Sequence, residues 1–130
     1  MRHSTICSIA LALCATTAGA APAAKLTCAI VDVFDCSGDQ CTEVTAEAVG
    51  VPELLRIDPA AKSMTALDTN LAGRTTTLDA VSKGEHKTAA RAHDGNRTLV
   101  LSVDDESGDA MLAVSDNKLV LVGYGECSSR

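Results

Sequence analysis

Aromatic side chains are almost absent from this chain: its 130 residues include one Phe, one Tyr and no Trp. Proteins that bind single-stranded nucleic acid stack the bases on aromatic rings, and this sequence offers almost none. The same shortage limits the core, because aromatic residues bury the most surface per side chain. A core made mainly of Leu and Val is expected to be marginally stable, so we expect covalent cross-links to support it.

Positive charge is also scarce. Lys and Arg together number 11 against 17 Asp and Glu, which gives a net charge of −6 at pH 7. An acidic surface repels phosphate groups at long range, and nucleic-acid binding depends largely on phosphate contacts. We therefore expect no nucleic-acid partner.

Long hydrophobic runs are missing as well. The main apolar segment, residues 6–17, is shorter than the roughly 20 residues that a membrane-spanning helix needs. It follows the charged start "MRH" and precedes the small residues "AGA", which is the pattern of a cleaved secretory signal peptide. We predict a signal peptide over residues 1–20, with cleavage after Ala20 or, as a second choice, after Ala23.

Removal of this leader leaves one domain's length of chain. Residues 21–130 carry ten Lys and Arg against seventeen Asp and Glu, a net charge of −7. We predict a single β-rich periplasmic domain over these residues, monomeric and not attached to the membrane after cleavage.

Four cysteines remain in that domain: Cys28, Cys36, Cys41 and Cys127. Four cysteines allow three pairings, and sequence alone does not choose among them. The turn residues "SGDQ" between Cys36 and Cys41 favour a local bond, which leaves Cys28 to pair with Cys127. Redox dithiols usually have two intervening residues at a helix N-terminus, and that pattern is absent here. We expect structural disulfides.

Short strands separated by turn residues recur along the domain. The expected strands are 25–34, 53–58, 61–68, 74–81, 96–104, 109–114 and 118–127. This spacing predicts an all-β fold, an antiparallel meander that forms a small sandwich or barrel. The last strand is apolar on both faces, which predicts that neighbours cover both. Two segments, 42–52 and 84–95, fit more than one structure: the first a strand, a helical turn or a loop, the second a helix or a hairpin arm.

No set of residues has the pattern of a catalytic or metal site. The acidic run "DDESGD" (104–109) does not match the EF-hand spacing, so we expect a solvated hairpin tip, with weak Ca²⁺ binding as the alternative. His86 and His93 are two potential ligands where zinc needs three or four, so we expect surface histidines and no cofactor. Gly-x-Ser-x-Gly is absent, and no carboxylate pair has a distinguishing spacing. We expect no enzymatic activity.

The segment "GYGEC" (123–127) is the most unusual in composition. Tyr124, the only tyrosine, stands between two glycines at the end of an apolar strand. The glycines would leave space for another chain or ring to approach Tyr124. The alternative, which we favour, is that Tyr124 and Phe34 are the two large pieces of the core.

Several motifs together resemble small uncharacterised exported proteins of proteobacteria. The matching features are Cys28, the "DC…C" hairpin of residues 35–41, "PELLRIDPAAK" (52–62), the hairpin 104–108 and the closing "GEC" (125–127). An alanine-rich segment at 82–95 departs from the pattern, since a more hydrophobic strand is expected there. The resemblance implies a β-rich periplasmic domain and no particular activity.

A looser likeness is to the periplasmic C-type lysozyme inhibitors, small disulfide-linked β-barrels. Their inhibitory loop has Ser-Gly followed shortly by Tyr; here Ser107 and Gly108 are followed by Met111. This likeness implies that Ser107 and Gly108 are candidate interaction residues, in addition to Tyr124, which is a candidate because of the glycines beside it.

Export, disulfides and the missing catalytic set lead to one expected function. We expect a non-enzymatic periplasmic binding or interaction module, which acts through its acidic surface on an unknown protein or small ligand. The first alternative is an inhibitor of a basic hydrolase such as lysozyme. The second is a metal-dependent enzyme that uses His86 and His93.

Overall fold

The structure, a computed structural model, describes residues 24–68, 71 and 73–129. The predicted signal peptide, residues 1–20, lies outside the described residues. The elements are β1 (Leu26–Asp35), β2 (Thr42–Val44), α1 (Ala46–Val49), β3 (Leu54–Asp58), β4 (Ser63–Ala66), β5 (Thr75–Lys83), β6 (Lys87–Asp94), β7 (Arg97–Asp104), β8 (Asp109–Ser115) and β9 (Val120–Ser128).

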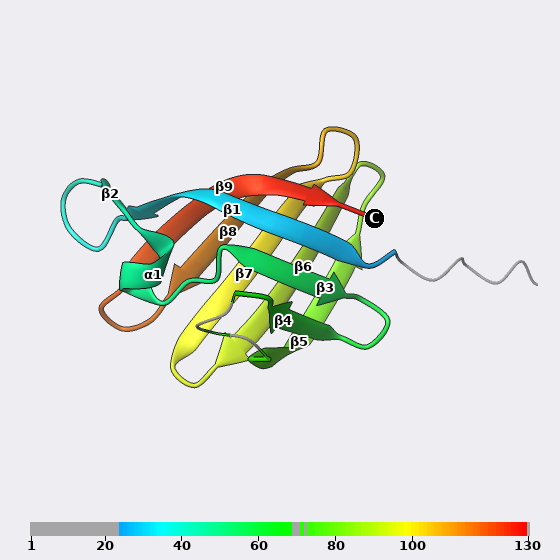
Figure 1. The fold of residues 1–130 in the computed structure, drawn as a ribbon, viewed down its shortest axis with the longest axis horizontal. Coiled ribbons are helices and arrows are strands. Elements are labelled where there is room, and N and C mark those ends of the chain that lie inside the picture. Colours follow the sequence, from blue (N-terminus) through cyan, green and yellow to red (C-terminus); the bar gives the residue numbers. More distant parts are fainter. Residues whose placement is uncertain (1–23, 69–70, 72, 130) are drawn as a thin grey trace, which may run out of the picture.

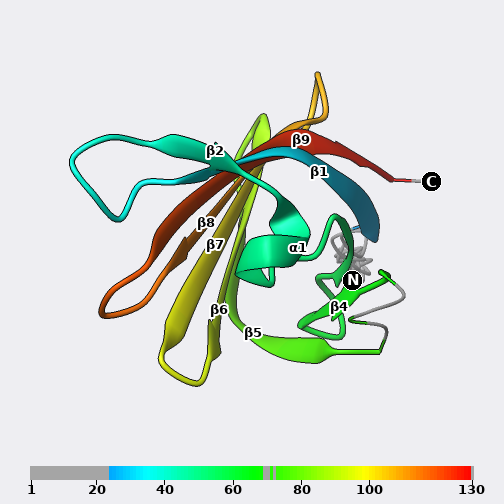
Figure 2. The ribbon, with the colours of Figure 1, turned by 60° about the vertical axis from the view of Figure 1, so that its left-hand side comes forward.

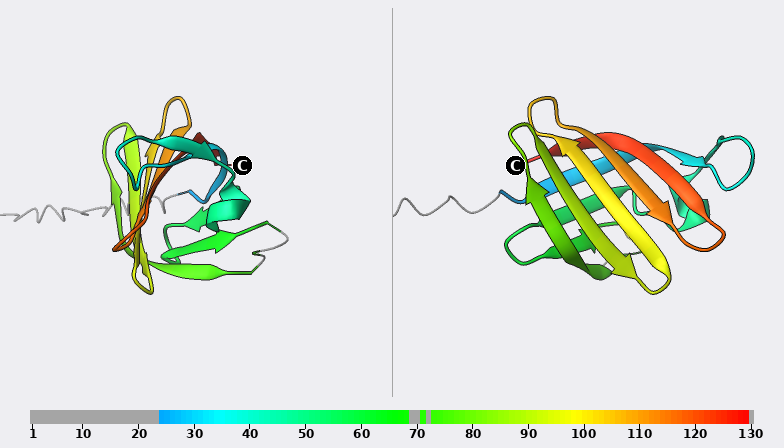
Figure 3. Two further views of the ribbon diagram at one scale, coloured as in Figure 1. Left: turned by 90° about the vertical axis from the view of Figure 1, so that its left-hand side faces the viewer. Right: turned by 180° about the vertical axis from the view of Figure 1, so that it is seen from behind.

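Eight of these strands form a closed antiparallel barrel (Figures 1 and 3). Each strand from β3 to β8 pairs with the one that follows it, and β1 closes the barrel by pairing with β3 on one side and β9 on the other. The short strand β2 pairs with the second half of β1, beyond the stretch that β3 covers. The predicted antiparallel meander is confirmed, and it closes as a barrel.

The two ends of the barrel differ. At one end, called here the α1 end, lie α1, the β1–β2 hairpin and the turns that precede β5, β7 and β9 (Figures 1 and 2). At the other end, called the terminal end, Ser128 pairs with Thr27, so the first and last strands end together. The β5–β6 and β7–β8 turns lie at this terminal end.

Alternate residues of each strand fill the barrel. The side chains pointing inward are almost all aliphatic, and the largest that are fully buried are Leu55, Ile57, Leu78, Leu112 and Leu121. Each such side chain contributes about 1.5–3 kcal/mol by leaving water. Neither aromatic residue belongs to this core.

The two ambiguous segments are now resolved. Residues 42–52 form β2 and then a single helical turn, α1, which Thr45 caps and which ends at Gly50 with φ of 66°. The alanine-rich segment is the strand β6, in which Ala90 and Ala92 face the barrel interior. Both belong to the same buried cluster as the larger aliphatic residues of the core.

The expectation that Tyr124 and Phe34 form the core is wrong. Tyr124 points outward and is 48% exposed, and Phe34 beside it is half-buried on the same outer surface. The expectation that β9 is covered on both faces is wrong as well, since only its inward face is buried. A barrel of this size has one layer of sheet, so the outer face of every strand meets solvent.

The glycines around Tyr124 do allow a close approach, and the approaching chain is β1. A Cβ on Gly125 would lie 1.8 Å from the carbonyl oxygen of Ala29, and a Cβ on Gly123 would lie 2.8 Å from Ile30. The pairing of β1 with β9 shifts register here, between Ile30 and Asp32. Glycine at these inward positions lets the two strands coil tightly where the barrel closes.

Both disulfides join the cysteines that the turn composition favoured. Cys28 and Cys127 face each other across β1 and β9, with 3.9 Å between their Cα atoms. Cys36 and Cys41 close the β1–β2 hairpin, with 4.1 Å between their Cα atoms. Among the described residues, no helix is long and apolar enough to cross a membrane.

Candidate functional site

The outer surface of β1, β9, β8 and β7 carries two adjoining rows of uncharged side chains. In the first row Phe34, Val122, Ala113 and Val100 stand opposite one another on successive strands. In the second row Tyr124 stands opposite Met111. We call these six residues the Tyr124 face.

Three members of the Tyr124 face are notably open to solvent. Tyr124 is 48% exposed, Met111 40% and Val100 38%. Exposed apolar residues scattered singly are ordinary, but a contiguous group on one sheet surface is typical of an interaction site. The group is contiguous here because strand register, rather than sequence proximity, assembles it.

The aromatic pair at the edge of the Tyr124 face is held in a fixed arrangement. The ring centroids of Phe34 and Tyr124 lie 6.2 Å apart, and the ring planes make an angle of 69°. Edge-to-face contacts of this kind are worth about 0.5–1.5 kcal/mol beyond the burial of area. The Tyr124 ring is therefore positioned before any partner arrives.

Acidic side chains border the second row. Asp109 stands directly opposite Glu126. This pair lies next to the Met111–Tyr124 pair, on the side of the terminal end. Asp32 stands opposite Tyr124 on β1. None of the three carboxylates forms an ion pair with another described residue. Like charges directly opposite each other destabilise a sheet.

The β7–β8 hairpin holds the predicted interaction residues Ser107 and Gly108 next to this acidic border. The Ser107 hydroxyl donates a hydrogen bond to Asp109 at 2.8 Å. The backbone amides of Ser107 and Glu106 donate to the Asp104 carboxylate, and these bonds lower its pKa. Gly108 has φ of 84° and accepts a hydrogen bond from the Cys127 amide, so the hairpin is fixed against β9.

The β1–β2 hairpin projects from the barrel at the α1 end (Figure 2). Its tip, residues 37–40, is exposed, and the Cys36–Cys41 disulfide closes its neck. Ser37 binds the Asp35 carboxylate through both its amide and its hydroxyl, which lowers the pKa of Asp35. The Val120 amide donates to the Ser37 hydroxyl at 2.9 Å, which ties the hairpin to the start of β9. The hairpin is therefore anchored at its neck, and its tip is exposed.

A polar cleft of about 370 Å³ lies at the terminal end. Thr88, the one buried polar residue among those described, donates to Asp105 at 2.8 Å, and Lys83 lies 3.4 Å from the other oxygen of that carboxylate. These groups satisfy one another, so we assign the cluster a structural role in joining β5 and β6 to the β7–β8 turn.

The two histidines do not form a common site. His86 lies in the β5–β6 turn at the terminal end, where it contacts Glu106 at 2.9 Å. His93 lies near the other end of β6 and contacts Asp79 on β5. In the part of the chain that the structure describes, no three His, Cys, Asp or Glu side chains gather as a metal site requires.

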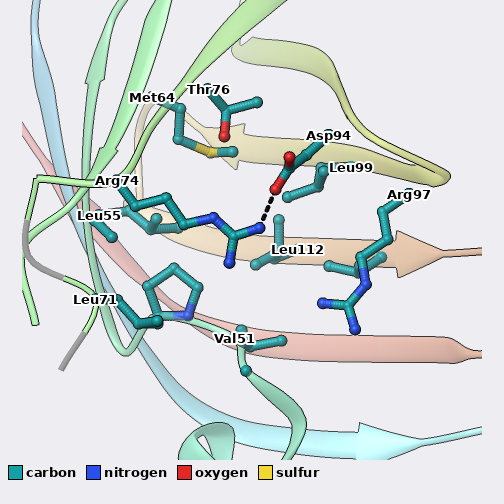
Figure 4. A pocket seen from close by; sticks show the side chains of 14 residues that line it. Val51, Leu55, Met64, Leu71, Arg74, Thr76, Asp94, Arg97, Leu99 and Leu112 are labelled. Atoms are coloured by element: carbon teal, nitrogen blue, oxygen red, sulfur yellow. Dashed lines mark hydrogen bonds and ion pairs between the residues drawn. The ribbon is translucent and has the colours of Figure 1, made fainter.

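A second pocket opens at the α1 end of the barrel (Figure 4). Aliphatic side chains line most of it, with Val51, Leu55, Met64 and Leu112 among the buried ones. Arg74, Asp94 and Arg97 stand around its rim. Its cavity volume is about 40 Å³, and the space between its walls reaches about 530 Å³ when open solvent at the mouth is included. We call it the mouth pocket.

Sequence patterns found part of this arrangement. Tyr124, Ser107 and Gly108 were identified from sequence, and the structure places all three along β8, β9 and the turn that begins β8. Met111 and Val100 were missed as surface residues, although the alternation in β7 and β8 would have placed them on one face. The mouth pocket was missed entirely, because its lining comes from four separate parts of the chain.

Comparison of the chain with protein families, with curated proteins and with solved structures gives no match.

Proposed function

We propose that this protein is a non-enzymatic binding module that recognises a protein partner through the Tyr124 face. The observation that carries the proposal is the contiguous, solvent-exposed row of Tyr124 and Met111 on a rigid sheet, bordered by unpaired carboxylates. Aromatic residues and Met are enriched at protein interfaces, and an aromatic ring that is already held in place loses little conformational entropy when a partner buries it.

The charges bordering the face define the partner. Asp32, Asp109 and Glu126 have no cation beside them among the described residues, so a partner with Lys or Arg around an apolar centre complements them. A second copy of this chain would bring one acidic border against another. The charge pattern therefore favours a basic protein over self-association.

Site-specific photo-cross-linking in the host tests the proposal. A benzophenone amino acid at position 124 is expected to give a discrete protein adduct, and the same group at Thr77 is expected to give none. Thr77 is an exposed residue on β5, which lies across the barrel from β9. The adduct should weaken when Asp109→Asn and Glu126→Gln are combined. Equal adducts at positions 124 and 77 would refute the proposal.

A second candidate function is inhibition of a basic hydrolase such as lysozyme. Tyr124 lies directly opposite Met111, so a tyrosine of the neighbouring strand stands beside the position at which the likeness expects one. An excess of the purified protein at low salt is expected to slow lysozyme, and Tyr124→Ala should restore the rate. Unchanged lysozyme rates would exclude this function for that enzyme.

We further propose that the protein acts in the periplasm. Two disulfides in a domain this small are typical of an oxidising compartment, and the first twenty residues have a signal-peptide pattern. The intact mass of protein recovered from its host is expected to lack residues 1–20. Alkylation should add nothing before reduction and four groups after it. Free thiols or an unprocessed N-terminus would contradict export.

A further inference from the structure

The mouth pocket combines an apolar wall with cationic groups, in a chain that is otherwise acidic. Its lining contains two guanidinium groups and one carboxylate, whereas the whole chain has a net charge of −6. Figure 4 shows Arg74 and Asp94 meeting across the rim, while the guanidinium of Arg97 extends over the wall toward Val51. The lining of the pocket therefore carries one more positive than negative charge, in a chain that is acidic overall.

Arg97 carries the argument, because most of its hydrogen-bonding capacity is unused. Its side chain is only 33% exposed, and its one ionic contact places Nε 3.7 Å from Asp116, too far for a hydrogen bond. Asp116 already accepts the amides of Lys118 and Leu119 at 2.8 Å. Among the described residues, Arg97 donates no side-chain hydrogen bond, although a guanidinium has five N–H donors.

Arg74 supplies a second cation whose present partner is easily exchanged. It pairs with Asp94, and the side chains of the two are 49% and 36% exposed. Ion pairs as exposed as this one contribute little to stability. Arg74 can therefore bind another anion without disturbing the barrel.

We propose that the mouth pocket binds a small amphipathic carboxylate, with the carboxylate on Arg97 and Arg74 and the apolar body against the aliphatic wall. A guanidinium binds a carboxylate through two parallel hydrogen bonds, which gives the site both affinity and orientation. The cavity volume of about 40 Å³ limits the buried part to a few carbon atoms, and the open mouth holds the rest.

Methyl NMR of methionine tests the proposal. The chain has three methionines: Met64 lines the mouth pocket, Met111 lies on the Tyr124 face, and Met1 is outside the described residues. Titration with hexanoate is expected to shift the Met64 signal in a saturable way and to leave Met111 unchanged. Acetate, which has the head alone, and 1-hexanol, which has the tail alone, should each bind at least about tenfold more weakly.

Substitution of the cation provides the matched comparison. Arg97→Gln is expected to weaken hexanoate binding at least about tenfold. Arg56→Gln removes the same charge from an exposed position on the outside of β3 and should have no effect. Three results would each overturn the proposal: equal binding of hexanoate and 1-hexanol, a Met64 signal that does not move, or a shift of the Met111 signal alone. The comparison of hexanoate with 1-hexanol uses the wild-type protein, so it tests the proposal even if a variant fails to fold. A Met64 signal that does not move would refute binding in the mouth pocket and would not bear on the proposed function of the Tyr124 face.

Discussion

At the scale of single residues, the closure of the barrel depends on two glycines, which have no side chain. Gly123 and Gly125 face inward on β9, where β1 crosses closely enough that any Cβ would collide with it. The side chain between them, Tyr124, is turned outward by the alternation of the strand. The two glycines thus allow β1 and β9 to approach closely, and the residue between them, Tyr124, points outward into solvent.

Gly125→Ala is expected to destabilise the protein by at least about 3 kcal/mol. Its new Cβ would meet the backbone carbonyl of Ala29 at 1.8 Å, and backbone does not move aside as a side chain does. Gly38→Ala is the control, since a Cβ added there would meet no atom within 4 Å apart from its own chain neighbours; we expect a change within about 0.5 kcal/mol. Urea unfolding monitored by circular dichroism measures both. A near-neutral Gly125→Ala variant would contradict this account of closure.

The contact between Phe34 and Tyr124 is also testable. We expect a double-mutant cycle with Phe34→Leu and Tyr124→Leu to give a coupling energy of about 0.5–1.5 kcal/mol. The cycle separates the edge-to-face contact from the area that each ring buries. A coupling indistinguishable from zero would mean that the ring of Tyr124 is not preorganised, which would weaken the proposed role of the Tyr124 face.

At the scale of elements, four turns share one device. Asp35, Asp58, Asp104 and Asp116 each accept a backbone amide from a residue two or three positions further on, and Asp35 also accepts the Ser37 hydroxyl, which has the largest effect there. These bonds lower the pKa of all four below the ordinary value of 3.8. Each carboxylate stands in for a backbone acceptor, so it fixes the chain reversal between two strands.

These turns predict how stability depends on pH. A carboxyl group whose pKa is lower in the folded state stabilises the fold above the unfolded pKa, and this contribution disappears as pH falls through the folded pKa. We expect the urea midpoint to be steady from about pH 7 to 5 and to fall below about pH 4. Asp104→Asn should lessen that fall, because the amide oxygen accepts the same N–H groups at any pH. A midpoint that stays constant down to pH 2 would contradict the assignment.

Strand positions were predictable from the sequence because turn residues separate apolar runs. The segments 96–104 and 109–114 correspond closely to β7 and β8. The segment 84–95 was ambiguous, because alanine favours a helix in isolation and only the neighbouring strands make it a strand. The position of Tyr124 was ambiguous for another reason. Its strand has apolar residues on both faces, and such a pattern does not reveal which face is covered. The mouth pocket depends on long-range contacts, which no local pattern contains.

At the scale of the whole molecule, the two disulfides constrain very different lengths of chain. Cys28 and Cys127 are 99 residues apart in sequence, whereas Cys36 and Cys41 are 5 apart. In the chain-entropy account, a longer closed loop restricts the unfolded state more.

Replacing Cys28 and Cys127 with alanine is expected to cost about 4–5 kcal/mol, against about 2 kcal/mol for Cys36 and Cys41. With a core almost free of aromatics, the first loss should leave the protein largely unfolded at 37 °C, while the second should leave it folded. Thermal unfolding of the two double variants measures the difference. Equal losses would show that chain entropy is not the dominant contribution of these bonds.

The bond between the first and last strands also makes nearly the whole described chain a covalent ring. All the turns that connect the barrel strands lie between Cys28 and Cys127 in sequence, so they belong to that ring. A protease that cuts one exposed turn therefore releases no fragment: the nicked chain stays a single molecule, held by the disulfide and by the hydrogen bonds of the remaining strands. In a compartment rich in proteases, such a protein would survive its first cleavage, and the damage would become visible only after reduction.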